Sequence, residues 1–177
     1  MSSFKDTLKK IKRDHPKPNA TIWDCLITMF INPSYNVLFN YRLGQYWYTS
    51  NFRIFKLMAS RMRMKLIFKR NCDISYLAKI GEKLKLVHPV GVVIGESEIG
   101  DNVIIFQNVT LGSDGKKGKE KSYPKIKDNA IIYSNAVILG GITIGHNAIV
   151  AASSVVNIDV PDNMVAIGVP CKIVEKS

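Results

Sequence analysis

The sequence predicts a mainly β protein, a parallel β-helix preceded by a small α-helical region. Three observations support this. Aliphatic residues recur every six positions after about residue 72, small residues recur at a fixed offset from them, and a helix-capping pattern precedes an apolar stretch before position 72. A period of six matches neither an α-helix nor simple strand alternation. It suits a solenoid whose coil has three short faces, because each face then buries one aliphatic side chain.

The repeat occupies most of the chain beyond residue 72. Small or β-branched residues often follow its aliphatic positions by four places, as at Val90 and Ala130. About a dozen hexads correspond to roughly four stacked coils. The aliphatic positions form three stretches: Ile74, Ile80, Leu86 and Val92; Ile99, Ile105 and Leu111; and Ile126, Ile132, Ile138, Ile144, Val150 and Val156.

Two regions follow from this pattern: a basic helical N-terminal region, 1–71, and a β-helix domain, 72–177, with a projecting loop at 112–124 and a C-terminal tail. The loop is too polar for a core, so we expect it to project and contribute to binding. A disordered insertion is the alternative.

Three helices are expected in the first region, over residues 22–31, about 35–48 and 52–70. Thr21 with Asp24 resembles a capping box. Pro33 ends the first helix, and Ser34 is placed to cap the second.

The net charge of +11 is concentrated in the first region. Residues 1–70 hold 14 Lys and Arg against three acids, whereas residues 71–177 hold 11 of each. This asymmetry indicates an acidic partner such as a membrane surface, with a solvated basic face as the alternative. Nucleic acid is not expected, because no recognised binding motif accompanies the charge.

The expected helix 52–70 mixes basic and apolar residues. Such a helix either lies on a membrane or packs its apolar stripe on the rest of the protein. We expect packing on the β-helix, with peripheral membrane contact through residues 53–70 as the alternative. The stripe consists of Ile54, Phe55, Leu57, Met58, Met62, Leu66 and Ile67.

Cysteine usage and hydropathy bear on location. Cys25, Cys72 and Cys171 show no paired or metal-type spacing, so free thiols in a reducing cytoplasm and no metal are expected. Residues 1–17 are polar, unlike a secretory signal. The best uncharged run, residues 25–41, is broken by Asn32, Pro33 and Ser34. A cytoplasmic protein is predicted, at the inner face of the membrane if the basic region binds lipid.

One histidine stands out as a candidate for chemistry. His88 lies two places after the inward Leu86 and next to Pro89, so it should face outward. A neutral imidazole there can accept the proton of a hydroxyl that attacks a thioester. A purely structural histidine is the alternative. Asp73 precedes His88 by 15 residues, close to a coil of 18, and would orient the imidazole from the adjacent rung.

Several motifs follow one another in a characteristic order. Together they resemble the catalytic domain of bacterial serine O-acetyltransferases and of the related capsule and exopolysaccharide O-acetyltransferases. The resemblance covers residues 73–175, with a further helix motif upstream. The motifs are Tyr41-Arg42-Leu43-Gly44-Gln45-Tyr46-Trp47, Asp73-Ile74, Lys79-Ile80-Gly81, His88 with Gly91-Val92-Val93-Ile94-Gly95-Glu96, Gln107-Asn108-Val109-Thr110-Leu111-Gly112, Pro124-Lys125-Ile126, Ile138-Leu139-Gly140 and Gly168-Val169-Pro170.

The resemblance implies a left-handed β-helix, a homotrimer with active sites between subunits, and acetyl-CoA as co-substrate. It assigns His88 as general base and Asp73 as its orienting partner. Asp14 would match an acceptor-binding aspartate. The positions implied to contact CoA are Ser113, Ser134, Ala152 and Lys172.

The acceptor is where the sequence departs from the serine enzymes. Those enzymes carry an Arg-His pair just before Pro-Lys-Ile, where this chain has Ser122 and Tyr123. Without the arginine, a bidentate partner for an amino-acid carboxylate is missing. We therefore expect O-acetylation of a carbohydrate hydroxyl of capsule, exopolysaccharide or O-antigen type. Serine O-acetylation in cysteine biosynthesis is the alternative, and a non-catalytic assembly platform is the third reading.

Overall fold

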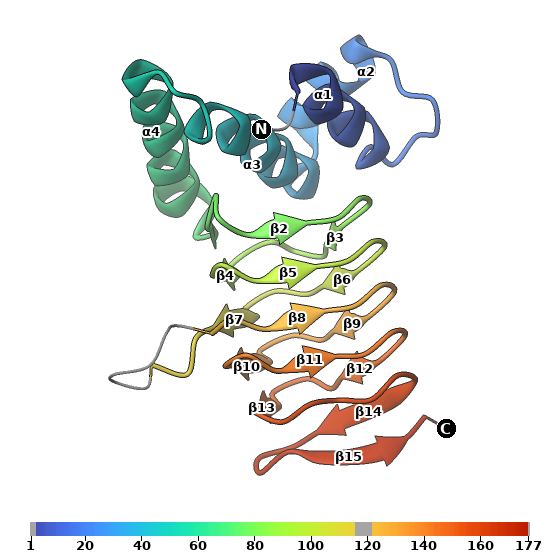
Figure 1. Ribbon diagram of the computed structural model, residues 1–177. Coiled ribbons are helices and arrows are strands. Elements are labelled where there is room, and N and C mark those ends of the chain that lie inside the picture. Colours follow the sequence, from blue (N-terminus) through green and yellow to red (C-terminus); the bar gives the residue numbers. More distant parts are fainter. Residues whose placement is uncertain (1–2, 116–121, 177) are drawn as a thin grey trace.

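The computed structural model describes residues 3–115 and 122–176. Four helices come first, and α4 ends three residues before the first strand (Figure 1). Their bounds are α1 Phe4–Arg13, α2 Ile22–Ile31, α3 Pro33–Tyr48 and α4 Arg53–Arg70.

Short strands then wind into a stack of coils below the helices (Figure 1). Each of the first four turns contributes one strand to each of three sheets, with the orders β1-β4-β7-β10-β13, β11-β8-β5-β2 and β15-β14-β12-β9-β6-β3. In the last turn the second sheet has only an isolated bridge between Ile144 and Val160. All pairings are parallel except the closing hairpin of β14 and β15. The strands are β1 Asp73–Ile74, β2 Lys79–Ile80, β3 Lys85–Leu86, β4 Val93–Ile94, β5 Glu98–Ile99, β6 Ile104–Ile105, β7 Thr110–Gly112, β8 Lys125–Ile126, β9 Ile131–Ile132, β10 Val137–Leu139, β11 Thr143–Ile144, β12 Ile149–Val150, β13 Val155–Val156, β14 Met164–Ile167 and β15 Lys172–Glu175.

The predicted aliphatic ladder forms the core. In one sheet Ile105 pairs with Leu86 on one side and Ile132 on the other, and Ile132 pairs in turn with Val150. These four side chains are at most 1% exposed. Small buried residues fill the corners, as expected, at Val103, Val109, Ala130, Ala136, Ala148 and Ser154.

The second coil departs from the predicted phase. Ile94, not Val92, is the ladder residue, because β4 pairs Ile74 with Ile94. Val92 is buried as the small corner residue, whereas Val90, assigned to that role from the sequence, is 54% exposed. Two extra residues therefore lie in the corner between Leu86 and Ile94. An insertion inside a corner keeps the strands paired and changes only the sequence spacing between successive ladder residues.

The helix caps agree in part with the prediction. Thr21 and Asp24 form the expected capping box of α2. Pro33, however, is the first residue of α3 rather than only a terminator, and Asn32 rather than Ser34 caps that helix through a 3.0 Å bond from the Tyr35 N–H. Proline suits a first helical position, where no N–H partner is needed. Helix α1 was not predicted.

The apolar stripe of α4 does not pack as predicted. Of its seven residues only Leu66 is buried, and Ile54, Phe55, Leu57 and Met58 are exposed. Ala59 and Leu66 supply the buried contact of this helix instead. Within the described residues, no helix is both long and apolar enough to cross a bilayer.

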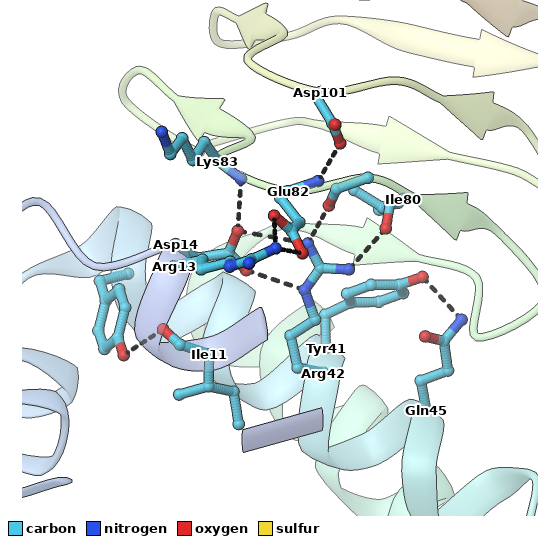
Figure 2. A network of polar contacts seen from close by, with 12 residues as sticks. Ile11, Arg13, Asp14, Tyr41, Arg42, Gln45, Ile80, Glu82, Lys83 and Asp101 are labelled. Carbon is cyan, nitrogen blue, oxygen red and sulfur yellow. Dashed lines mark hydrogen bonds and ion pairs between the residues drawn. The ribbon is translucent and has the colours of Figure 1, made fainter. Parts of the chain in front are cut away.

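A buried polar network fastens α3 to the top coil (Figure 2). The Arg42 guanidinium is 2% exposed and pairs with Asp14 at 2.8 Å. It also donates to the carbonyl oxygens of Ile80, at 2.7 Å, and Gly81. The Tyr41 hydroxyl donates to the Ala78 carbonyl at 2.7 Å. The upstream helix motif is therefore the structural joint between the two regions.

Candidate active site

His88 sits on the corner between β3 and β4, where the two extra residues lie. Its side chain is exposed, as predicted, while Pro89 beside it is buried. Its backbone is left-handed, with φ of 51°. The Val90 N–H donates to the His88 carbonyl at 2.6 Å, so the corner is tightly turned.

The corners below are simpler. They place a single residue at positive φ, Asn108, Asn135 or Ser153, whereas the upper corner has both His88 and Gly91. Gly91 takes the stacking position, because its N–H bonds to the Asn71 carbonyl and an added Cβ would lie 2.1 Å from the Asn108 side chain. His88 therefore belongs to the inserted part of this corner, and Gly91 is the residue that stacks on the corner below. A left-handed backbone at a non-glycine residue costs about 1–3 kcal/mol and is often found at functional sites.

Asp73 is not hydrogen-bonded to His88 in this single chain. Its two carboxylate oxygens accept from Arg63 of α4, at 2.6 and 3.0 Å. The bidentate bond to Asp73 raises the pKa of Arg63, which stays charged. Arg63 was not identified from the sequence, because the helix pattern marks it only as one of several cations.

Ser134 and Ala152 lie on the same edge of the β-helix as His88, in the corners before β10 and β13. The chain stacks in register there: Asn135 N–H bonds to the Gln107 carbonyl and Ser153 N–H to the Ser134 carbonyl. Lys172 is exposed at the start of β15, paired with Ile167 next to this edge. His88 and three of the four implied CoA positions therefore follow one line down the coils.

The other implied positions occupy a different edge, between β7 and β8. Ser113 follows β7, and Ser122 and Tyr123 precede β8. The Tyr123 ring packs on Gly95, where an added Cβ would lie 2.4 Å from the ring. Ser122 similarly approaches Gly141. Much of the predicted loop, residues 116–121, lies outside the described residues.

Asp14 is enclosed by protein. Its side chain is 1% exposed, and its oxygens accept from Arg42 and from the Lys83 N–H at 2.8 Å (Figure 2). Burial raises the pKa of Asp14, while the charge of Arg42 opposes this shift. Its role as an acceptor ligand stays a prediction, one that this geometry does not favour.

A cleft of about 1120 Å³ opens between the helical region and β3. Leu86, two residues before His88 in the sequence, is among its lining residues, and His88 is not. Asp14 and Glu82 line it but are paired with Arg42 and Arg13. The remaining charged lining is basic: Lys9, Lys12, Lys17, Lys83 and Lys85. In the part of the chain that the structure describes, no group of three or more His, Cys, Asp or Glu side chains is placed to hold a metal ion.

A family match over part of the β-helix defines the class of protein. The family model of the bacterial transferase hexapeptide, described as six repeats, matches residues 123–157. With the three-sheet coil, this makes the chain a hexapeptide-repeat transferase with a left-handed parallel β-helix after a small helical region, as predicted.

The similar proteins narrow the class. A serine acetyltransferase of Bacillus pumilus is 47% identical over 108 residues, which cover 60% of this chain and 49% of that protein. A solved serine acetyltransferase in complex with cysteine has a TM-score of 0.81 and 30% identity, covering 97% of this chain and 71% of that one. Another solved serine acetyltransferase, in complex with CoA, has a TM-score of 0.79 and 29% identity, and the match covers 97% of this chain and 71% of that one. The chain belongs to the serine acetyltransferase family, and it spans about half the length of the curated relatives it matches.

The expectation of a carbohydrate acceptor is wrong on these findings. It depended on two positions, Ser122 and Tyr123. The structural similarity instead covers 97% of this chain, the helices included, and relatives that are 44–49% identical over 55–68% of it are serine acetyltransferases. Two side chains at one edge carry less weight than a match over the whole fold.

Proposed function

We propose that the chain catalyses transfer of an acetyl group from acetyl-CoA to the hydroxyl of L-serine. The observation that carries this proposal is His88, held on an inserted, left-handed corner of a serine acetyltransferase fold. Residues 1–71 would form the helical region and 72–177 the catalytic domain.

In this mechanism the His88 imidazole accepts the proton of the serine Oγ as that oxygen attacks the thioester carbonyl. The new O–C bond forms, the C–S bond breaks, and the imidazolium returns the proton to the departing CoA sulfur. General-base help of this kind contributes about 10²–10⁴ in rate. The products are O-acetylserine and CoA.

Direct attack by the serine hydroxyl is favoured over an acyl-cysteine intermediate, because the three cysteine thiols are either protonated or buried. Burial raises the pKa of Cys72 to about 12, and the charge of Asp73 adds to the shift. Burial also raises the pKa of Cys171. A protonated thiol is a poor nucleophile. Cys25 is 1% exposed in the helical region, out of reach of a substrate.

The edge below His88 is the proposed CoA site. Backbone groups of Ser134 and Ala152 would contact the extended cofactor, and Lys172 would lie near its phosphates. The solved relative in complex with CoA supports CoA as the product and acetyl-CoA as the donor. Asp73 is proposed as the carboxylate that orients His88, with Arg63 holding it in place.

A homotrimer would complete the site, because the His88 edge and the edge with Ser113, Ser122 and Tyr123 lie on different sides of sheet β1-β4-β7-β10-β13 in one chain. The outward residues of the two sheets beside the His88 edge are mostly aliphatic, which suits subunit contact. The aliphatic ones are Val93, Val137 and Val155 on one side and Ile104, Ile131 and Ile149 on the other, next to Asp73, Thr110 and Lys85. The third sheet instead presents Lys79, Glu98, Lys125 and Thr143.

The basic cleft supports an acceptor that carries a carboxylate. Its lysines supply positive charge between the helical region and β3, which would partly offset the missing arginine, and Lys17 among them is also paired with Asp24. Lysine binds as a point charge, so weaker orientation of serine is expected than from a bidentate arginine. The Ser122 and Tyr123 hydroxyls are proposed as hydrogen-bonding groups for the acceptor.

The test is thiol release from acetyl-CoA with L-serine, compared with D-serine and with a neutral glucoside. We expect saturable release with L-serine alone. No serine-dependent release would overturn the acceptor assignment.

The base is tested by substituting His88. We expect His88→Ala to lower kcat by about 10²–10⁴-fold with unchanged circular dichroism. His146→Ala is the matched control, since His146 lies on a β-helix corner on another edge, near Asp128 at 3.7 Å, and should retain activity. Full activity of His88→Ala, or equal loss in both variants, would exclude His88 as the base.

A further inference from the structure

Helix α4 presents one continuous outward face of mixed character. Positions 54, 58, 61, 65 and 68 follow helical spacing and so lie along one side. Opposite them, Ala59 and Leu66 pack on the protein. The large apolar side chains exposed on this face are Ile54 at 60%, Leu57 at 56%, Met58 at 40%, Met64 at 49% and Phe68 at 75%.

Cations lie among these apolar residues. Arg61, Lys65 and Lys69 are exposed on the same side. The helix contains seven basic residues and no acid, and of these Arg63 is paired with Asp73. The outward face therefore offers apolar surface and positive charge together.

This combination distinguishes between possible partners. A second copy of the same face would bring like charges together, which is unfavourable. A nucleic acid would engage the cations but leave Leu57 and Phe68 in water. An anionic bilayer surface satisfies both, because apolar side chains enter the acyl boundary while lysine and arginine reach the phosphates.

We propose that the α4 face binds the surface of a membrane that contains anionic lipid. The 18-residue helix would lie in the plane of the interface over roughly 27 Å. The remaining cations of residues 1–70 would add long-range attraction. This binding is independent of the acetyl transfer proposed above.

The experiment is co-sedimentation of the full chain with vesicles of phosphatidylcholine alone or mixed with phosphatidylglycerol. We expect binding only to the anionic vesicles, weakened at high salt. The triple variant Arg61→Gln, Lys65→Gln, Lys69→Gln should lower the partition coefficient on the order of 100-fold, because each basic residue contributes a few-fold at an anionic surface. Glutamine retains helix propensity.

Two control variants distinguish binding by the α4 face from non-specific binding through net charge or through other exposed apolar residues. Lys5→Gln, Lys10→Gln, Lys127→Gln removes the same charge elsewhere, outside the cleft, and should retain most binding. Ile27→Gln with Phe30→Gln removes exposed apolar residues of α2 and should also bind, whereas Leu57→Gln with Phe68→Gln should not. Absence of binding to anionic vesicles by the wild type, or equal losses in the α4 and control variants, would overturn the proposal. Circular dichroism and thiol release report whether each variant is folded.

Discussion

The two regions of the chain differ in how they hide apolar surface. In the β-helix, Ile105, Ile132 and Ile138 are 0% exposed, whereas Trp23, Phe30 and Phe68 of the helical region are 72–78% exposed. Each coil buries its ladder against the coils above and below, so the core needs no distant partner. The helices are joined to the first coil by an apolar contact that includes Val37, Tyr41 and Leu66 and by polar contacts around Arg42 and Arg63, and they leave other faces open. The β-helix is therefore closed by its own repeat, and the helical region is built to contact something else.

The largest effect on stability should come from the joint. Arg42→Met leaves Asp14 buried without its cation and two carbonyls without a donor, so we expect a loss of about 3–5 kcal/mol. Urea unfolding followed by circular dichroism measures it. The exposed pair of Lys79 with Glu98 is the contrast, and Lys79→Met should cost only about 0–1 kcal/mol.

The double variant Asp14→Asn, Arg42→Met sharpens this result. Because it removes both charges, it should recover part of the stability lost by Arg42→Met. If the double variant is less stable than the single one, burial of an unpaired Asp14 charge is not the cause of the loss.

A smaller effect is expected from removing one ladder residue. Ile132→Ala leaves a cavity between Ile105 and Val150, at a cost of about 2–5 kcal/mol. Leu57→Ala removes a similar side chain from the open face of α4 and should change the free energy of unfolding by about 0.5 kcal/mol or less. Similar losses in both would mean that the α4 face is covered in solution.

The smallest expected effect on stability is the pH-dependent contribution of Asp24 in the capping box of α2. Bonds from the Thr21 N–H and hydroxyl, with Lys17 nearby, lower the pKa of Asp24 from 3.8 to about 2. The ionised Asp24 carboxylate therefore stabilises the folded state above pH 3.8, and this contribution is lost as the pH falls towards 2. The difference in melting temperature between wild type and Asp24→Asn should therefore shrink on acidification over this range. A constant difference would show that the charge of Asp24 is not what stabilises the cap.

Much of the fold was determined by the sequence alone, because the signals are local. A hexad places its own aliphatic residue inward whatever follows, so the three sheets and the outward direction of His88 were predictable. The same holds for the capping box, which spans four residues. The resemblance in the motifs led to the family, although Ser122 and Tyr123 were overinterpreted as a change of acceptor.

Only the tertiary structure decided how distant segments use their groups. Asp14 is an ordinary loop carboxylate in the sequence, and it becomes a buried partner of Arg42 because the chain returns 28 residues later. Asp73 was expected beside His88, yet α4 brings Arg63 to it. The insertion at residues 87–92 also required the strand register, since a corner can absorb extra residues without changing the hydrophobic pattern of its neighbours. Burial of the α4 stripe depends on the area that α3 and the first coil offer, and that area accommodates Ala59 and Leu66 but not the rest of the helix.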